Sequence, residues 1–175
     1  MRVRELFSAD AVRSRVAELA QQLARDYADA PFVIVCIDRG AVRFVEALVA
    51  ALTRHGVRPE VCHVRARRSE GRELRAVEVE SFDPTVFEDR DVLVVDDIAD
   101  EGATLRAVRE LVADAEPRSL RSAVLVDKRE SRREPVRPDY VGFEVERGWV
   151  VGFGMDLDGS YRELDFVGVV VDPRF

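Results

Sequence analysis

The stretch from Val92 to Leu105 constrains the fold more than any other, because it changes character three times over a short span. Val92 to Val95 form an unbroken aliphatic run, typical of a strand buried on both faces of a parallel sheet. The carboxylates Asp96, Asp97, Asp100 and Glu101 and a glycine follow, and then Thr104, which can cap the helical pattern beginning at Leu105. We therefore expect a buried strand, an acidic turn, a tight loop and a helix N-terminus.

This order of elements also predicts a chemistry. A loop that enters a helix N-terminus offers backbone N–H groups and a positive dipole end, which suit a phosphate. Carboxylates placed just before the loop would repel the phosphate, so Asp96, Asp97 and Asp100 should face hydroxyls, a base proton or a metal. The pattern indicates a ribose-phosphate site, and the alternative is a solvated acidic turn behind a core strand.

The stretch resembles the diphosphoribose-binding motif of the type I phosphoribosyltransferases. The acidic pair matches Asp96-Asp97, and the phosphate loop matches Asp100-Glu101-Gly102-Ala103-Thr104. One position departs from the family pattern, since Glu101 stands where a threonine is usual. A carboxylate there should weaken phosphate binding unless it turns outward or meets an arginine such as Arg106.

The rest of the chain alternates helical and strand patterns, which predicts an α/β fold with a mainly parallel central sheet flanked by helices. The same pattern predicts one domain over residues 1–175. We expect helices from Ser8 to about Tyr27, from Val42 to Arg54 and from Thr104 to about Ala115. The expected strands besides the central one cover residues 32–37, 60–65, 76–81 and 122–126. Residues 65–75 form a polar loop that fits a mobile hairpin or a lid, although it lacks the family's Ser-Tyr pair beyond Ser69.

Asp38-Arg39-Gly40 also lies between a buried strand and a helix. It resembles the pyrophosphate-binding loop of the hypoxanthine-guanine branch of the family, and the alternative is an ordinary turn with a solvated arginine. The C-terminal region, with Trp149-Val150 to Asp156 and Tyr161 to Leu164, is similar to the same branch. There, strands and loops build a small hood over the purine, which we expect from about residue 138 to residue 175.

The resemblance implies transfer of phosphoribose from phosphoribosyl pyrophosphate to a purine. It implies Asp100 as the acid–base group, and a 5′-phosphate and ribose site made by Asp96, Asp97, Asp100, Glu101, Gly102, Ala103 and Thr104. Pyrophosphate would meet Arg39, Gly40 and Arg162, and the purine would meet Lys128, Trp149, Val150 and Asp156. Mg²⁺ would be held by Asp96, Asp97 and Asp156.

Composition limits the partners and the alternatives. The net charge of −7 argues against a general nucleic-acid binder. No apolar stretch approaches membrane-spanning length, so we expect a cytoplasmic protein that does not bind a membrane. The resemblance implies a homodimer or homotetramer. Cys36 and Cys62 fit buried free thiols, and His55 and His63 fit structural roles.

Two other functions stay open at this point. One is a non-catalytic, nucleotide-binding regulator of the same fold, which an arginine patch around Arg129, Arg132 and Arg133 would favour. The other is a transferase for another oxopurine such as xanthine. Lys128, the only lysine of the chain, should donate to the 6-oxo group and separate oxopurines from adenine.

Overall fold

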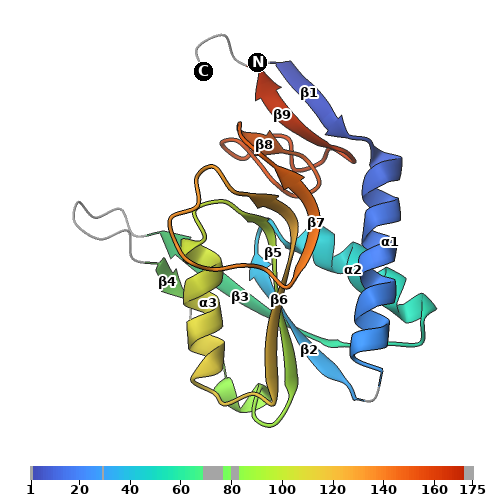
Figure 1. The fold of residues 1–175 in the computed structure, drawn as a ribbon, viewed down its shortest axis with the longest axis vertical. Helices are drawn as coiled ribbons and strands as arrows, with labels where there is room; N and C mark the ends of the chain where they lie inside the picture. The colour runs from blue at the N-terminus through green and yellow to red at the C-terminus, as the bar shows by residue number, and fades with distance from the viewer. Residues whose placement is uncertain (1, 29, 69–76, 80–82, 172–175) are drawn as a thin grey trace.

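The computed structural model describes residues 2–28, 30–68, 77–79 and 83–171. Its main element is a six-stranded sheet in the order β4-β3-β2-β5-β6-β7 (Figure 1). Five of these strands pair in parallel: β2 (Phe32–Asp38), β3 (Glu60–Arg68), β5 (Asp91–Ala99), β6 (Ser119–Lys128) and β7 (Tyr140–Val145). The short edge strand β4 (Val77–Val79) pairs antiparallel with β3. The expected α/β class with a mainly parallel sheet is confirmed.

Helices cover both faces of this sheet. α1 (Ala9–Asp26) and α2 (Val42–Arg54) lie on one face, α3 (Ala103–Ala113) lies on the other, and a short 3-10 helix covers Pro84–Val86 (Figure 1). Strand β2 shows why both faces are needed, because its alternate side chains belong to different cores. Phe32, Ile34 and Cys36 pack with α1 and α2, whereas Val33, Val35 and Ile37 pack with α3.

The helix predictions hold closely. Ser8 caps α1 by accepting a hydrogen bond from the N–H of Ala11 at 3.2 Å, and α2 has the predicted bounds. Among the described residues, no helix combines the length and the apolar character that a membrane span requires.

A second, three-stranded antiparallel sheet lies above the main one, in the order β1-β9-β8 (Figure 1). It consists of β1 (Arg2–Phe7), β9 (Val167–Val171) and β8 (Val150–Val151). We refer to this sheet together with residues 146–149 and 152–166 as the hood. Two expectations are corrected here: the hood begins after residue 145 rather than near 138, and it includes the N-terminal strand β1. Strand β7 belongs to the main sheet because it pairs in parallel with β6. The segment that connects β6 to β7 is irregular and shows no helical pattern in the sequence.

The strand ends also differ from the prediction. β5 continues through Asp96 and Asp97 to Ala99, so the acidic pair lies in the strand and not in a turn. Pairing with β6 explains the extension, since Asp96 lies opposite Val124 and Ala99 opposite Asp127. β3 and β6 are likewise longer than expected, and β6 ends at Lys128. Residues 69–76, which hold most of the expected lid, lie outside the described residues.

Candidate active site

A cavity of about 350 Å³ lies at the carboxyl edge of the main sheet. Its lining joins the end of β5, the loop into α3, the loop after β2 and Trp149 of the hood. Ligands of open α/β sheets bind at this edge, where strand ends and helix N-termini meet. The cavity therefore unites three stretches that the sequence singled out separately.

The loop from Asp100 to Thr104 turns at a glycine. Gly102 is the N-cap of α3 with φ +89°, a backbone conformation that favours glycine. A Cβ there would lie 2.8 Å from the side chain of Val136, so the close packing also requires glycine. Thr104 is thus not the cap that we expected, because the helix already starts at Ala103. The first N–H groups of α3 have no acceptor within the helix and remain the anion-binding feature of this loop.

A partly buried arginine, Arg132, supports the same loop. Arg132 donates from Nε to the carbonyl oxygen of Asp100 at 2.9 Å and from Nη2 to that of Ala99 at 2.8 Å. It also forms an ion pair with the buried Asp127 at the end of β6. From the sequence, Arg132 is expected only as part of an arginine patch, because nothing there distinguishes an arginine that binds backbone carbonyls from a solvated one.

The two adjacent carboxylates of β5 have different surroundings. Asp96 is buried, and its Oδ1 accepts the N–H of Asp97 at 2.9 Å. The carboxylate of Asp97 lies directly against Gly40, where a Cβ would be only 1.9 Å from Oδ2. Loss of hydration raises the pKa of Asp97, against the opposing effects of Asp96, the Ile98 N–H and Arg162. The end of β5 therefore concentrates acidic groups that the protein only partly compensates.

Asp100 and Lys128 come together across the ends of β5 and β6. Nζ of Lys128 lies 3.1 Å from Oδ2 of Asp100, and the lysine is buried. The other oxygen, Oδ1, is buried and has no hydrogen-bond partner among the described residues. A buried acceptor without a donor is costly. The site thus holds one carboxylate oxygen suited to a donor from a ligand.

The loop after β2 contacts the hood. Gly154 has φ +103°, and a Cβ on it would lie 2.3 Å from the carbonyl oxygen of Gly40, so the two loops touch through their backbones. Arg162 donates to the carbonyl oxygen of Gly154 at 2.7 Å and pairs with Asp156 at 2.5 Å. Arg39 is exposed beside this contact. Arg39, Gly40 and Arg162, the predicted pyrophosphate residues, are therefore close together. Arg162, however, already binds Gly154 and Asp156 of the hood.

Trp149 reaches the cavity from the hood. Its side chain is largely exposed, and its Nε1 donates to the carbonyl oxygen of Asp156 at 3.1 Å. An exposed tryptophan at a cavity wall fits a stacking surface better than a core residue. The neighbouring Val150 is buried and does not line the cavity.

Comparison with known proteins agrees with this geometry. The family of phosphoribosyl transferase domains matches residues 3–158. The chain belongs to the phosphoribosyltransferase family. It is 34% identical to the hypoxanthine-guanine phosphoribosyltransferase of Streptococcus thermophilus, over 97% of this chain and 94% of that protein. The corresponding protein of Dictyostelium discoideum is 32% identical, over 93% of this chain and 92% of its own length.

A solved structure extends the likeness to three dimensions. The hypoxanthine phosphoribosyltransferase of Trypanosoma cruzi in complex with the product IMP has a TM-score of 0.89 and 30% identity. The match covers 97% of this chain and 94% of that one. The type I phosphoribosyltransferase fold that the sequence resemblance implied is confirmed.

Glu101, the departure from the family pattern, has a partner in the structure. Its Oε1 lies 3.5 Å from Nε of Arg133, whose N–H also donates to the carbonyl oxygen of Glu101. Arg106, the arginine suggested by the sequence, instead pairs with Glu110 and Glu134. The charge of Glu101 is therefore partly neutralised, but by a residue from the β6–β7 connection.

The carboxylates of the site have the chemistry that Mg²⁺ prefers, since they are hard oxygen donors. Among the described residues, however, Asp96, Asp97 and Asp156 do not form a group whose ligand atoms all lie within 4.8 Å of one another. Asp156 binds Arg162 and also accepts the N–H of Gly159 at 2.6 Å. Mg²⁺ is commonly held by one or two carboxylates together with substrate phosphates, so Asp96 and Asp97 alone fit that pattern.

The three arginines expected to mark a regulator are engaged. Arg129 pairs with Asp127 and Glu144, Arg132 pairs with Asp127, and Arg133 pairs with Glu101. Because each of them has an acidic partner, they give little support to the arginine patch that would favour this alternative.

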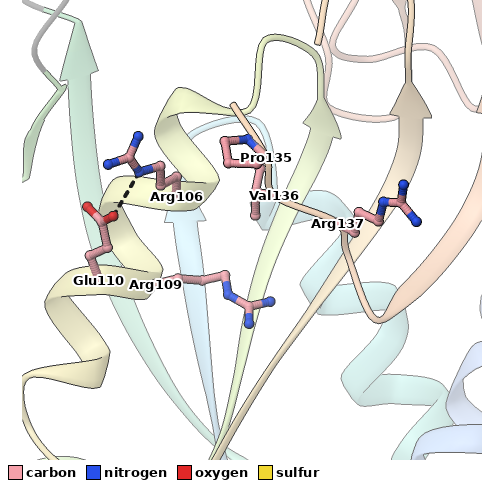
Figure 2. Close-up of a pocket in the computed structure, with 6 residues that line it drawn as sticks. All are labelled: Arg106, Arg109, Glu110, Pro135, Val136 and Arg137. Atoms are coloured by element: carbon pink, nitrogen blue, oxygen red, sulfur yellow. Dashed lines mark hydrogen bonds and ion pairs between the residues drawn. The ribbon is translucent and has the colours of Figure 1, made fainter. Parts of the chain in front are cut away.

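A second cavity, of about 300 Å³, lies between α3 and residues 135–137 (Figure 2). Two of its three arginines are also occupied: Arg106 by Glu110 and Glu134, and Arg109 by Ser122 and Asp139. It contains neither a glycine loop nor converging carboxylates, so it does not resemble the first cavity.

Proposed function

We propose that the protein is a purine-salvage phosphoribosyltransferase. It transfers the phosphoribosyl group of phosphoribosyl pyrophosphate to hypoxanthine or guanine, which gives IMP or GMP and pyrophosphate. The observation that carries the proposal is the cavity in which the phosphate loop, the acidic end of β5, the loop after β2 and Trp149 meet. The names of the relatives, and the IMP complex of the Trypanosoma cruzi enzyme, support the same activity.

In this proposal the ribose phosphate lies over the start of α3. Its 5′-phosphate accepts from the N–H groups of residues 101–104 and from the hydroxyl of Thr104. Glu101, Gly102 and Ala103 contribute through their backbone, and Asp96 and Asp97 accept hydrogen bonds from the ribose hydroxyls. The leaving pyrophosphate meets Arg39, the N–H of Gly40 and Arg162, which must then part from Asp156.

Mg²⁺ is the proposed cofactor, held by Asp96 and Asp97, with Asp156 as a further ligand once Arg162 has turned to the pyrophosphate. When bound, the ion offsets the negative charge of the phosphates. The protein's own contribution is the pair Asp96 and Asp97 at the end of β5, where burial raises the pKa of Asp97.

The base is bound between Trp149 and the ends of β5 and β6. The purine N9 forms a bond to C1′ of the ribose as the bond from C1′ to pyrophosphate breaks, and the base loses a proton. Asp100 is the group we assign to this proton, because its buried Oδ1 has no other donor among the described residues. Trp149 stacks on the purine. Val150 and Asp156 contribute their backbone to the hood side of the purine site.

Lys128 is the proposed selectivity residue. An ammonium has three N–H donors, and the pair with Asp100 uses one of them. A second can donate to the 6-oxo group of hypoxanthine, guanine or xanthine, whereas the 6-amino group of adenine is itself a donor. Lys128 therefore separates oxopurines from adenine but does not rank the oxopurines.

We further propose that the enzyme works in the cytoplasm as a homodimer or homotetramer and does not bind nucleic acid or a membrane. The assembly rests on the family resemblance alone. Light scattering after size exclusion measures it directly, and a monomeric mass at assay concentration would contradict it.

The activity is tested with purified protein, Mg²⁺ and phosphoribosyl pyrophosphate, to which hypoxanthine, guanine, xanthine and adenine are offered in turn. We expect ultraviolet changes for nucleotide formation with hypoxanthine and guanine, and little with adenine. If no base reacts while nucleotides still raise the melting temperature, the site binds without catalysis and the regulator is the better interpretation.

A Lys128→Met variant tests the selectivity in the same assay, because the methionine side chain is nearly as long as that of lysine but carries no charge. A hydrogen bond to a charged group amounts to roughly 1.5–3 kcal/mol, so the preference for hypoxanthine over adenine should fall about ten- to a hundredfold. An unchanged preference would remove Lys128 from the recognition of the 6-position.

A further inference from the structure

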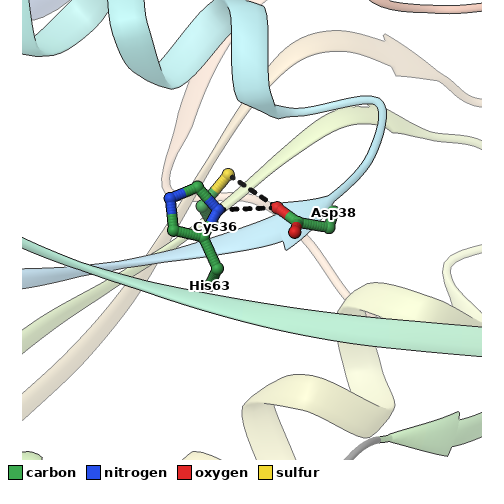
Figure 3. A group of neighbouring side chains, drawn as sticks. All are labelled: Cys36, Asp38 and His63. Atoms are coloured by element: carbon green, nitrogen blue, oxygen red, sulfur yellow. Dashed lines mark hydrogen bonds and ion pairs between the residues drawn. The ribbon is translucent and has the colours of Figure 1, made fainter.

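Three side chains with different ligand chemistry meet on one face of the main sheet, beside the site described above. Cys36 and Asp38 are alternate residues of β2, so their side chains share a face. His63 of β3 lies directly opposite Cys36 in the parallel register. Figure 3 shows the thiol and the imidazole both directed toward the carboxylate of Asp38. The cluster thus follows from strand pairing and not from a flexible loop.

The distances are compatible with metal coordination. Sγ of Cys36 lies 3.7 Å and Nδ1 of His63 lies 2.7 Å from Oδ1 of Asp38. One ligand atom from each residue can be chosen so that all three lie within 4.8 Å of one another. Zinc bonds of about 2.0–2.3 Å in tetrahedral geometry separate ligand atoms by about 3.3–3.8 Å. The sulfur–oxygen distance of 3.7 Å already falls in this range. The nitrogen–oxygen distance of 2.7 Å would have to lengthen by about 0.6 Å.

We propose that Cys36, Asp38 and His63 form a binding site for a borderline divalent transition metal such as Zn²⁺, separate from the proposed Mg²⁺ site. A thiolate, an imidazole and a carboxylate are the three ligand types of zinc sites, and Mg²⁺ selects oxygen alone. With a thiolate and a carboxylate, the ligand set carries two negative charges, which the ion neutralises. Water would take the fourth position, since three protein ligands leave it open.

The surroundings allow an ion to enter. The side chain of His63 is 53% exposed and that of Asp38 is 18% exposed, while Cys36 is fully buried. Asp38 also lines the cavity of the candidate active site, so an ion would approach from the side of His63 and Asp38 and not from that of Cys36.

The chain offers a matched control for two of the ligands. It has two cysteines and two histidines, and one of each lies outside the cluster. Cys62 precedes His63 and, by strand alternation, packs with the core on the α3 side of the sheet. His55 is the C-cap residue of α2.

The experiment titrates tag-free, metal-stripped protein with Co²⁺, which substitutes for Zn²⁺ and reports a sulfur ligand through a charge-transfer band in the near ultraviolet. We expect one Co²⁺ per chain with this band, loss of the band in Cys36→Ser, and an unchanged band in Cys62→Ser. His63→Gln should weaken binding at least about tenfold, since losing only an outer-shell partner already costs 10–100-fold. His55→Gln should bind like the unchanged protein.

A second readout does not depend on the buried cysteine. Zn²⁺ should raise the melting temperature of the unchanged protein, because it binds the folded state. The rise should disappear in His63→Gln, whose exposed side chain can be replaced without disturbing the core. An equal rise in both proteins, a band that survives Cys36→Ser, or no saturable binding would each overturn the site. Because neither readout needs a substrate, failure of the metal site and failure of the proposed activity are separate results.

Discussion

The two ends of strand β5 carry the same residue type in opposite situations. At the amino end, Asp91 accepts hydrogen bonds from Nε of Arg118 at 3.1 Å and from Oγ of Ser119 at 2.6 Å, and Nη2 of Arg118 lies 2.5 Å away. These partners lower the pKa of Asp91 below its ordinary value. At the carboxyl end, burial raises the pKa of Asp97, and Oδ1 of Asp100 has no partner among the described residues.

Asp91 has the partners of a carboxylate that stabilises the fold, whereas Asp97 and Asp100 have surroundings that suit the binding of a ligand. Asp91 connects β5 to the start of β6, and donors reach both of its carboxylate oxygens. At the other end, burial disfavours the charge of Asp97, and Oδ1 of Asp100 has no donor among the described residues; in our proposal Mg²⁺ and the substrate supply these partners. Changes at the two ends should therefore affect different measurements.

The largest expected effect is on turnover, at the carboxyl end. Asp100→Asn keeps an oxygen for Lys128 but removes the carboxylate that accepts the proton of the base. A positioned acid–base group typically contributes 10²–10⁴-fold, so kcat should fall by about that factor. The ultraviolet assay with hypoxanthine measures it, and the far-ultraviolet circular dichroism spectrum should stay native. An unchanged rate would exclude Asp100 as the acid–base group.

A smaller effect is expected at Glu101, where the structure shows partial compensation by Arg133. Glu101→Thr should tighten binding of phosphoribosyl pyrophosphate by about three- to tenfold, because it removes one negative charge beside the 5′-phosphate. Calorimetric titration in the presence of Mg²⁺ gives the dissociation constant.

Arg133→Ala is the matched control, because it exposes the charge of Glu101 and should weaken the same binding. The double variant should bind like Glu101→Thr alone, since Arg133 then has no carboxylate to neutralise. If Arg133→Ala weakens binding equally in both backgrounds, the arginine acts on the phosphate directly and the ion pair with Glu101 is incidental.

The fold was largely predictable because its core strands are aliphatic on both faces and its helices have clear ends. Ser8 and the apolar face of α1 predicted one helix, and the apolar run from Phe32 to Ile37 predicted strand β2. The hood was less predictable. β1 and β9 are paired although they are distant in sequence, and β7 reaches the main sheet through a connection without a helix. Such pairings depend on tertiary context that a local pattern does not contain.

The candidate site was predictable where a motif spans consecutive residues, as in Asp96 to Thr104. Contacts between distant segments were not predictable: Arg132 on the carbonyl oxygens of Ala99 and Asp100, Arg133 on Glu101, and His63 on Asp38. Arg43 is a further example, since it binds the carbonyl oxygens of Arg162 and Leu164 and so ties α2 to the hood. In the sequence the arginines are indistinguishable from solvated charges and His63 fits a structural role, and only the fold gives each of them its partner.

The smallest expected effect is at the amino end of β5 and concerns stability alone. Asp91→Asn should lower the free energy of unfolding at pH 7 by about 1 kcal/mol, because it weakens hydrogen bonds to a partly exposed arginine. For a chain of this size the melting temperature should fall by about 2–4 °C. Activity at 25 °C should not change, since Asp91 lies at the opposite end of the strand from the cavity.

The pH dependence of this difference tests its cause. A carboxyl group whose pKa is lowered by folding contributes stability above its unfolded pKa of about 3.9, and the contribution disappears as pH falls through the folded pKa. The gap between the unchanged protein and Asp91→Asn should therefore be constant near neutral pH and close below about pH 4. A gap that persists in acid would mean that Asp91 acts through shape and neutral hydrogen bonding. The two ends of β5 would then differ in packing and not in how their charges are compensated.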